Sequence, residues 1–248
     1  MLIVVRFIAL KKYLDQRINK MEKTTYSKSI ALKALEMGAI RLSPNKPFCW
    51  ASGYYMPIYN DNRTLLASAE VREMIASSFE EILSSLHFDP DNIAGTSTAG
   101  IPHATTLADK MKKSLSYIRS SSKDHGLQNQ IEGLGRAKSY EGKKVLLIED
   151  LISTGGSSIA AVKAIQEANG LVPYCLAIFS YGTKEAKEAF SSLSPKCTAL
   201  TILDYDYVIK LAHETGYINE NEFNMLQSWS SNPFLWGEKH GFKREIKG

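Results

Sequence analysis

The chain has 248 residues, of which 44% are hydrophobic and 23% charged, as expected for one large globular domain or two small ones. No apolar run approaches the roughly 20 residues that a membrane-spanning helix needs, and the formal net charge of +4 is too small to indicate nucleic-acid binding. The three cysteines have no metal-site or C-x-x-C spacing, which favours a reducing cytoplasm. The apolar start runs into Lys11 and Lys12 instead of a small-residue cleavage site, so it is a poor signal peptide.

The first half of the chain predicts two helices with strands around them. Apolar residues at helical spacing predict helices over residues 27–38 and 68–86. Between these helices, the aromatic and small residues of segment 48–63 predict short strands and a turn. Residues 91–113 then predict a strand, a glycine-bounded loop and a helix opened by Pro102.

The second half alternates between apolar strands and helices. Strands are expected at residues 115–119, 143–148, 171–180 and 197–203, with helices at residues 157–170 and 183–190. Such alternation is typical of a mainly parallel sheet with helices on both faces. The tail from Asp204 predicts two helices, with Trp229 and Trp236 near the second.

Residues 120–135 have no hydrophobic period and are rich in serine and glycine, so they predict a long loop of the kind that is usually functional or disordered. Around this loop, residues 110–144 contain nine Lys or Arg against three Asp or Glu. A solvated face and a patch for a polyanionic small molecule both explain that cluster. His103, just after Pro102, is expected at the surface.

The stretch LLIEDLISTGGSS, residues 146–158, joins an apolar strand to two acids and then to a loop of hydroxyl residues and glycines. The loop can present backbone N–H groups and hydroxyls to a phosphate at a helix N-terminus. Glu149 and Asp150 would repel that phosphate, but a short distance away they suit sugar hydroxyls or hydrated Mg²⁺. The stretch therefore predicts a ribose 5-phosphate site; the plain alternative is a serine-capped helix after an acidic turn.

A second glycine loop, GTSTAGIP, has the glycine spacing of a nucleotide-hydrolase phosphate loop. Ile101 and Pro102 stand where that loop needs Lys and then Ser or Thr, which excludes a nucleotide hydrolase of this type.

Four segments resemble the orotate phosphoribosyltransferase family and keep the expected order. VLLIEDLISTGGSS resembles the signature with which type I phosphoribosyltransferases bind 5-phosphoribosyl 1-pyrophosphate (PRPP). FCWASGYYMPIYNDNR resembles the family's N-terminal F-x-x-x-S-G-x-x-x-P-x-Y-x-D-x-R pattern. GTSTAGIPHA resembles its pyrophosphate-side loop, and RSSSKDHG resembles its mobile loop. The signature alone indicates only the superfamily, whereas the four segments together indicate the orotate enzymes.

The resemblance implies a fold, a reaction and partners. The fold is α/β, with a central mainly parallel sheet flanked by helices and a small hood from the N-terminal segment. The reaction transfers the 5-phosphoribosyl group from PRPP to orotate with Mg²⁺, giving orotidine 5′-monophosphate (OMP) and pyrophosphate in pyrimidine biosynthesis. Because the family's mobile loop reaches the neighbouring subunit's site, a homodimer is implied, with no nucleic-acid or membrane partner.

The resemblance also implies roles for individual residues. Lys123, His125 and Asp150 are implied as catalytic, and Asp150 could also order Mg²⁺ through a water. The residues implied to bind PRPP are Arg119, Lys123, His125, Glu149, Asp150, Leu151, Ile152, Ser153, Thr154, Gly155, Gly156 and Ser157. Ser153 also matches a position that touches orotate. Arg63 is a candidate for the orotate carboxylate, which arginine can hold bidentately, although an ion pair with Asp61 explains Arg63 equally well.

The sequence departs from the family where basic residues are usual. Ser120 replaces a second basic residue after the loop arginine, Ala99 a lysine in the pyrophosphate-side loop, and Ala51 a lysine before the Ser-Gly pair. An arginine often found after the strand ending near Ser180 is missing, and Met56 stands where serine is usual. These departures leave the partner of the orotate carboxylate open.

The expected organisation is a single phosphoribosyltransferase domain over residues 21–248. Within it, residues 21–66 form the hood and base-binding segment, 67–203 the PRPP-binding core and 204–248 the C-terminal helices. Residues 1–20 lie outside the resemblance, and both an upstream start choice and a helical extension explain them. Two alternatives stay open for function. The first is a phosphoribosyltransferase for another base, which the segments WASG and YNDNR make less favourable. The second is a PRPP-sensing regulator, for which no DNA-binding segment is visible in the sequence.

Overall fold

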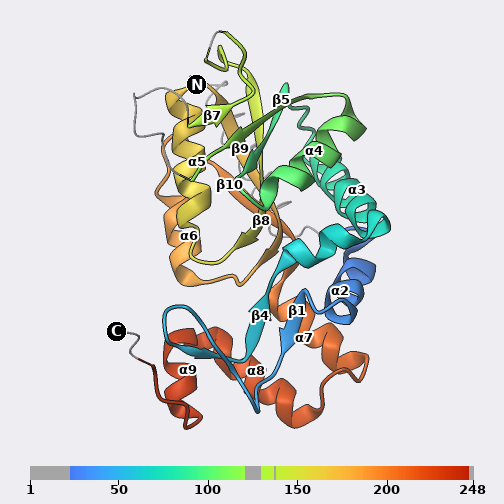
Figure 1. Ribbon diagram of the computed structural model, residues 1–248, viewed down its shortest axis with the longest axis vertical. Helices are drawn as coiled ribbons and strands as arrows, with labels where there is room; N and C mark the ends of the chain where they lie inside the picture. Colours follow the sequence, from blue (N-terminus) through green and yellow to red (C-terminus); the bar gives the residue numbers. More distant parts are fainter. Residues whose placement is uncertain (1–22, 121–129, 137, 246–248) are drawn as a thin grey trace, which may run out of the picture.

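A computed structural model describes residues 23–120, 130–136 and 138–245 as an α/β protein (Figure 1). The helices are α2 (Ser27–Glu36), the 3-10 helix η1 (Asn62–Ala67), α3 (Ala69–Ser85), α4 (Gly100–Met111), α5 (Gly156–Glu167), α6 (Lys184–Ser191), α7 (Tyr205–Glu214), α8 (Glu220–Ser231) and α9 (Pro233–Lys239). The strands are β1 (Ile40–Leu42), β2 (Phe48–Cys49), β3 (Tyr55–Met56), β4 (Ile58–Asn60), β5 (Asn92–Thr96), β6 (Ser114–Ile118), β7 (Ile131–Glu132), β8 (Lys144–Ile152), β9 (Leu171–Ser180) and β10 (Thr198–Asp204).

Six strands form the main sheet, in the order β10-β9-β8-β5-β6-β7, and every pairing is parallel except that of β6 with β7. The continuous apolar run of β8 is explained by its central place, where residues on both sides of the strand are buried. Helices α3 and α4 cover one face and α5 and α6 the other (Figure 1). The buried side chains accordingly form two clusters, one containing Phe79 and Leu107, the other Val162 and Phe190. This confirms the expected fold class.

The chain reverses direction across the sheet between β5 and β8. From β5 it continues to β6 on one side, whereas β8 pairs with β5 on the other side. The loops that follow these two strands therefore diverge and leave a crevice at the carboxyl edge, where open parallel sheets bind ligands. The two glycine loops of the sequence, residues 96–100 and 153–156, are those loops.

The hood consists of two small antiparallel pairs, β1 with β4 and β2 with β3. The β1–β4 pair lies between the main sheet and helices α8 and α9 (Figure 1). The C-terminal segment holds the β2–β3 hairpin, because the Glu245 amide donates to the Gly53 carbonyl at 2.9 Å and Phe242 stacks on Tyr55. A buried aromatic group joins hood and core, with Trp229 Nε1 donating to Met56 Sδ.

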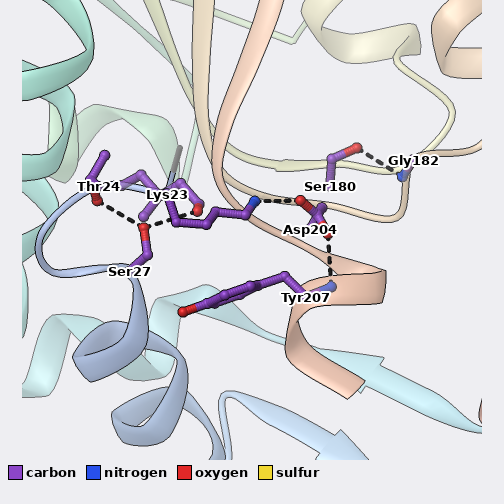
Figure 2. Close-up of polar contacts among 8 residues, drawn as sticks. Lys23, Thr24, Ser27, Ser180, Gly182, Asp204 and Tyr207 are labelled. Carbon is purple, nitrogen blue, oxygen red and sulfur yellow. Dashed lines mark hydrogen bonds and ion pairs between the residues drawn. The ribbon is translucent and has the colours of Figure 1, made fainter. Parts of the chain in front are cut away.

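The first described residues are fixed to the edge of the sheet (Figure 2). Lys23 forms an ion pair with Asp204 at the end of β10, and its ammonium lies 5.1 Å from the centre of the Tyr207 ring. Asp204 also accepts from the Tyr207 amide at 2.9 Å, which caps α7. Thr24 donates to the buried Ser78 hydroxyl of α3 at 2.9 Å. These contacts dock α2 against α3 and α7.

The structure corrects three details of the expected elements. The segment expected as one loop contains β7, whose two residues are too few to show a period. The described part of the tail forms three helices rather than two, because Pro233 starts a separate helix α9 directly after α8. Helix α4 begins at Gly100, before Pro102. The hydroxyl and glycine content of the preceding loop hid that earlier start.

Residues 1–22, 121–129, 137 and 246–248 lie outside the described part of the chain. Among the residues that are described, no helix is long and apolar enough to cross a lipid bilayer. All three cysteines are free thiols, and Cys175 and Cys197 are buried.

Candidate functional site

The loop after β8 is shaped to receive an anion. Strand β8 runs through both acids to Ile152, and α5 starts at Gly156 with Gly155 as its N-cap. Gly155 has φ +87°, a left-handed conformation that side-chain-bearing residues rarely adopt. The Thr183 hydroxyl donates to the Ser153 carbonyl at 2.9 Å and fixes the start of the loop. The loop thus turns sharply into the N-terminus of α5, where free N–H groups favour a negative ligand.

Glu149 is buried, with 4% of its surface exposed, and its carboxylate accepts from four donors. Oε1 accepts from the Thr96 hydroxyl at 2.6 Å and the Asp150 amide at 3.1 Å. Oε2 accepts from the hydroxyls of Ser157 and Ser158, both at 3.1 Å. A carboxylate offers about four acceptor positions, so protein donors fill those of Glu149.

Asp150 differs from its neighbour because its side chain is partly exposed. Burial, and then the nearby charge of Glu149, raise the pKa of Asp150 to about 7. The Asn62 amide donates to the Asp150 backbone carbonyl at 2.7 Å and links the strand to η1. The side chain of Asp150 is partly exposed at the crevice and suits a hydroxyl-bearing or cationic ligand.

Asp150→Asn should therefore stabilise the unliganded protein at alkaline pH. The pKa of Asp150 is about 7 in the folded protein, whereas an ordinary aspartate has a pKa of 3.8. The folded state therefore favours the protonated acid. The stability that this provides is complete below pH 3.8 and is lost as the pH rises through 7. Because asparagine does not titrate, its free energy of unfolding should exceed that of the wild type by on the order of 2 kcal/mol at pH 8 and match it near pH 4. Urea unfolding at both pH values measures the difference. Glu167→Gln, at an exposed position near the end of α5, is the control; an Asp150→Asn gain independent of pH would contradict the assignment.

The loop after β5 lies against β8 and starts α4 at close range. A Cβ on Gly100 would lie 2.5 Å from Thr96 Oγ1 and 2.6 Å from the Ile148 carbonyl oxygen. Gly95 is equally confined, since its Cβ would lie 2.8 Å from the Ile101 Cα. At both glycine positions of the GTSTAG motif, neighbouring atoms thus lie too close to leave room for a side chain. The N-terminus of α4 and that of α5 consequently open at the same edge of the sheet.

His103 is not the surface residue expected from sequence. It is 1% exposed on the face of α4 that turns into the core, and within the described chain neither ring nitrogen has a hydrogen-bond partner. Burial, and then the positive charge of Arg72, lower the pKa of His103 to about 4. The neutral ring behaves as a core side chain.

The hood packs against the carboxyl edge of the sheet through an aromatic contact. Trp50 lies 5.4 Å from the Tyr181 ring and donates from Nε1 to the Ile58 carbonyl at 3.1 Å. Tyr181 is joined to the loop after β8 by its amide, which donates to the Ile152 carbonyl, and its phenol hydrogen-bonds the backbone of Asn60. Both polar atoms of the Asn60 side chain are buried without a partner in the described structure. A buried amide without a partner is energetically unfavourable, so Asn60 is a candidate for hydrogen bonding to a ligand with imide groups.

The arginines expected in the site have acidic partners. Arg63 binds Asp61 bidentately, with Nε 2.6 Å from Oδ1 and Nη2 2.8 Å from Oδ2, and its side chain is 66% exposed. The alternative of an Asp61 ion pair is therefore what the structure contains. Arg119 lies 3.7 Å from Glu132 across the β6–β7 pair. Lys123 and His125 lie outside the described residues.

Sequence reasoning missed the residues that support the loops. Thr96, Ser158 and Asn62 contact the acid pair from β5, α5 and η1, and none of the three is itself charged. Asn60 was quoted within YNDNR without a role. A weak signal was present: a hydroxyl directly after a buried strand and serines at the start of a helix often bond to a nearby carboxylate.

Comparison with known proteins agrees with this geometry. Residues 62–193 match the family model of the phosphoribosyl transferase domain. The orotate phosphoribosyltransferase of Staphylococcus saprophyticus is 46% identical over 206 residues, covering 83% of this chain and 98% of that protein. The Lactococcus lactis subsp. cremoris orotate phosphoribosyltransferase is 43% identical over 210 residues, covering 85% and 98%.

Among solved structures, the orotate phosphoribosyltransferase of Aeropyrum pernix superposes with a TM-score of 0.64 at 20% identity, over 77% of this chain and 99% of that one. That likeness concerns the fold, whereas the curated relatives are similar over nearly their whole length. With residue identity this high, and with both glycine loops at the switch point of the sheet, the chain belongs to the orotate phosphoribosyltransferase family.

Proposed function

We propose that the protein transfers the 5-phosphoribosyl group of PRPP to orotate, giving OMP and pyrophosphate. The observation that carries this proposal is the meeting of two glycine loops at the carboxyl ends of β5 and β8, with Asp150 between them. One loop suits a 5-phosphate, the other suits a pyrophosphate, and the acid suits the ribose that joins them. The family's curated relatives are named for the same reaction.

In this proposal the 5-phosphate lies at the N-terminus of α5, bound by Ser153, Thr154, Gly155, Gly156 and Ser157. Leu151 and Ile152 present the loop, and Asp150 accepts from the ribose hydroxyls. The orotate ring lies between the hood and the loop, near Trp50, Tyr181 and Asn60, with Ser153 at its edge. Arg63 reaches the orotate carboxylate only if it leaves Asp61, since both of its donors on that side are occupied.

The chemistry asked of the site is electrostatic. As the bond from C1 to pyrophosphate breaks, positive charge grows on the ribose and negative charge on the leaving group, so donors and cations that hold the leaving oxygens lower the barrier. Arg119, Lys123 and His125 are proposed for that role on the family resemblance, together with the N-terminus of α4. Asp150, close to the ribose, favours the positive charge.

Mg²⁺ is proposed as the cofactor, associated mainly through PRPP. The partly exposed carboxylate of Asp150 fits a divalent cation held through water. When bound, Mg²⁺ neutralises charge on the pyrophosphate. We also propose a homodimer in the cytoplasm, one domain over residues 21–248 with the hood, core and tail boundaries at 66 and 203, and an extension at 1–20.

The test is base specificity. Protein, PRPP and Mg²⁺ are mixed in turn with orotate, uracil, hypoxanthine and adenine, and pyrophosphate release is measured. Orotate alone should support rapid release. Turnover with a purine and none with orotate would show that the family's fold serves another base in this chain.

A further inference from the structure

We propose that Glu149 is a positioning residue that locks the two anion loops together, and that Asp150 alone of the acid pair contacts the ribose. This inference rests on the proposed function, because it assigns the loops to the two ends of PRPP. It departs from the assignment that the signature motif suggests for Glu149, which would have it bind PRPP directly.

The first argument is acceptor capacity. The four donors to Glu149 lie at 2.6–3.1 Å and occupy both carboxylate oxygens. A ribose hydroxyl could bind Glu149 only by displacing one of them. Two of these donors, Thr96 and Ser158, are themselves 4% and 0% exposed, so water could not replace the lost partner easily.

The second argument is the position of the donors. Thr96 ends β5 and begins the loop to α4, whereas Ser157 and Ser158 lie in the first turn of α5. Among the described residues, the Glu149 carboxylate accepts hydrogen bonds from both segments. Thr96 in turn lies against Gly100, the first residue of α4. A shift of the carboxylate would therefore move both helix N-termini relative to each other.

The third argument is the contrast between the two acids. Glu149 is buried with hydroxyl donors on both oxygens, whereas the side chain of Asp150 is partly exposed. Hydrogen bonds to both oxygens fix the orientation of the Glu149 carboxylate. Glu149 thus has the properties of an internal tie, and Asp150 those of a ligand-binding acid.

The experiment compares a ligand without ribose with a ligand that has one. Isothermal titration calorimetry measures Mg²⁺-pyrophosphate and OMP binding to the wild type, Glu149→Gln, Thr96→Val, Ser158→Ala and the Glu149→Gln/Thr96→Val double variant. A tie predicts that Glu149→Gln weakens pyrophosphate about tenfold although pyrophosphate has no ribose. Thr96→Val, which is isosteric, should produce a similar loss, and the double variant should be no worse than the poorer single one. Thr96→Ser, which keeps the hydroxyl, should recover most of the affinity.

Asp150→Asn is the matched comparison, since it should weaken OMP far more than pyrophosphate. If Glu149→Gln weakens OMP and leaves pyrophosphate binding intact, Glu149 contacts ribose and the inference is wrong. If Glu149→Gln does not fold, the Thr96 and Ser158 variants decide by themselves, because unchanged pyrophosphate affinity in both would refute the tie. Wild-type protein that binds neither ligand would instead refute the proposed function.

Discussion

Gly100→Ala is expected to lower kcat/KM at least about 100-fold while the protein remains folded. The added methyl group would lie 2.5 Å from Thr96 Oγ1 and 2.6 Å from the Ile148 carbonyl oxygen. The second atom belongs to the backbone of the central strand, so the start of α4 must move instead. A displacement on the order of 1 Å at a catalytic helix N-terminus is enough for a loss of this size.

Steady-state pyrophosphate release with orotate and PRPP measures the effect, and a thermal melt shows that the variant is folded. The control is Gly216→Asn in the turn after α7, where no atom lies within 4 Å of an added Cβ and asparagine tolerates the left-handed φ of +73°. It should keep wild-type activity. A fully active Gly100→Ala enzyme would mean that the pyrophosphate is not bound at this loop.

Asn60→Leu should raise the KM for orotate about 100-fold and leave the KM for PRPP nearly unchanged. The side-chain amide of Asn60 is buried with neither polar atom paired in the described chain, and it lies on the strand that also bonds Tyr181. One donor and one acceptor side by side match the N–H and C=O of a pyrimidine imide edge. Leucine has a similar volume and no polar atoms, so it removes recognition without opening a cavity.

The melting temperature separates this role from a structural one. Since leucine replaces an unpaired buried amide, Asn60→Leu should be as stable as the wild type or more stable. A lower melting temperature together with an unchanged KM for orotate would show that Asn60 is a structural residue of the hood.

The fold could be predicted from sequence because its elements carry strong local patterns. The apolar run of β8 and the helical spacing of α3 leave little choice of structure or of buried face. The phosphate loop was equally easy to predict, since its function depends on the order of acids, hydroxyl residues and glycines along the sequence. Contacts over long sequence separations were not visible. That β7 would pair with β6, or that Glu245 would bond Gly53, depends on tertiary packing.

The sequence predicted which residues lie in the site better than it predicted what each residue does there. Glu149 and Asp150 form one motif in the sequence, and only the packing of Thr96 and Ser158 around Glu149 distinguishes them. The sequence left open whether Arg63 binds the substrate or Asp61. Its two short hydrogen bonds to Asp61 depend on the local turn into η1. His103 was misjudged because its place after Pro102 does not show which face of α4 packs against α3.

A crystal structure of the protein with bound OMP tests the central claim most directly. The account predicts the 5-phosphate at the N-terminus of α5 against Gly155 and Gly156, the ribose hydroxyls on Asp150, and the pyrimidine ring near Trp50, Tyr181 and Asn60. Glu149 should keep its hydrogen bonds to Thr96 and Ser158 in that complex. OMP bound away from the crevice between β5 and β8, or in the crevice with its phosphate away from α5, would contradict the account.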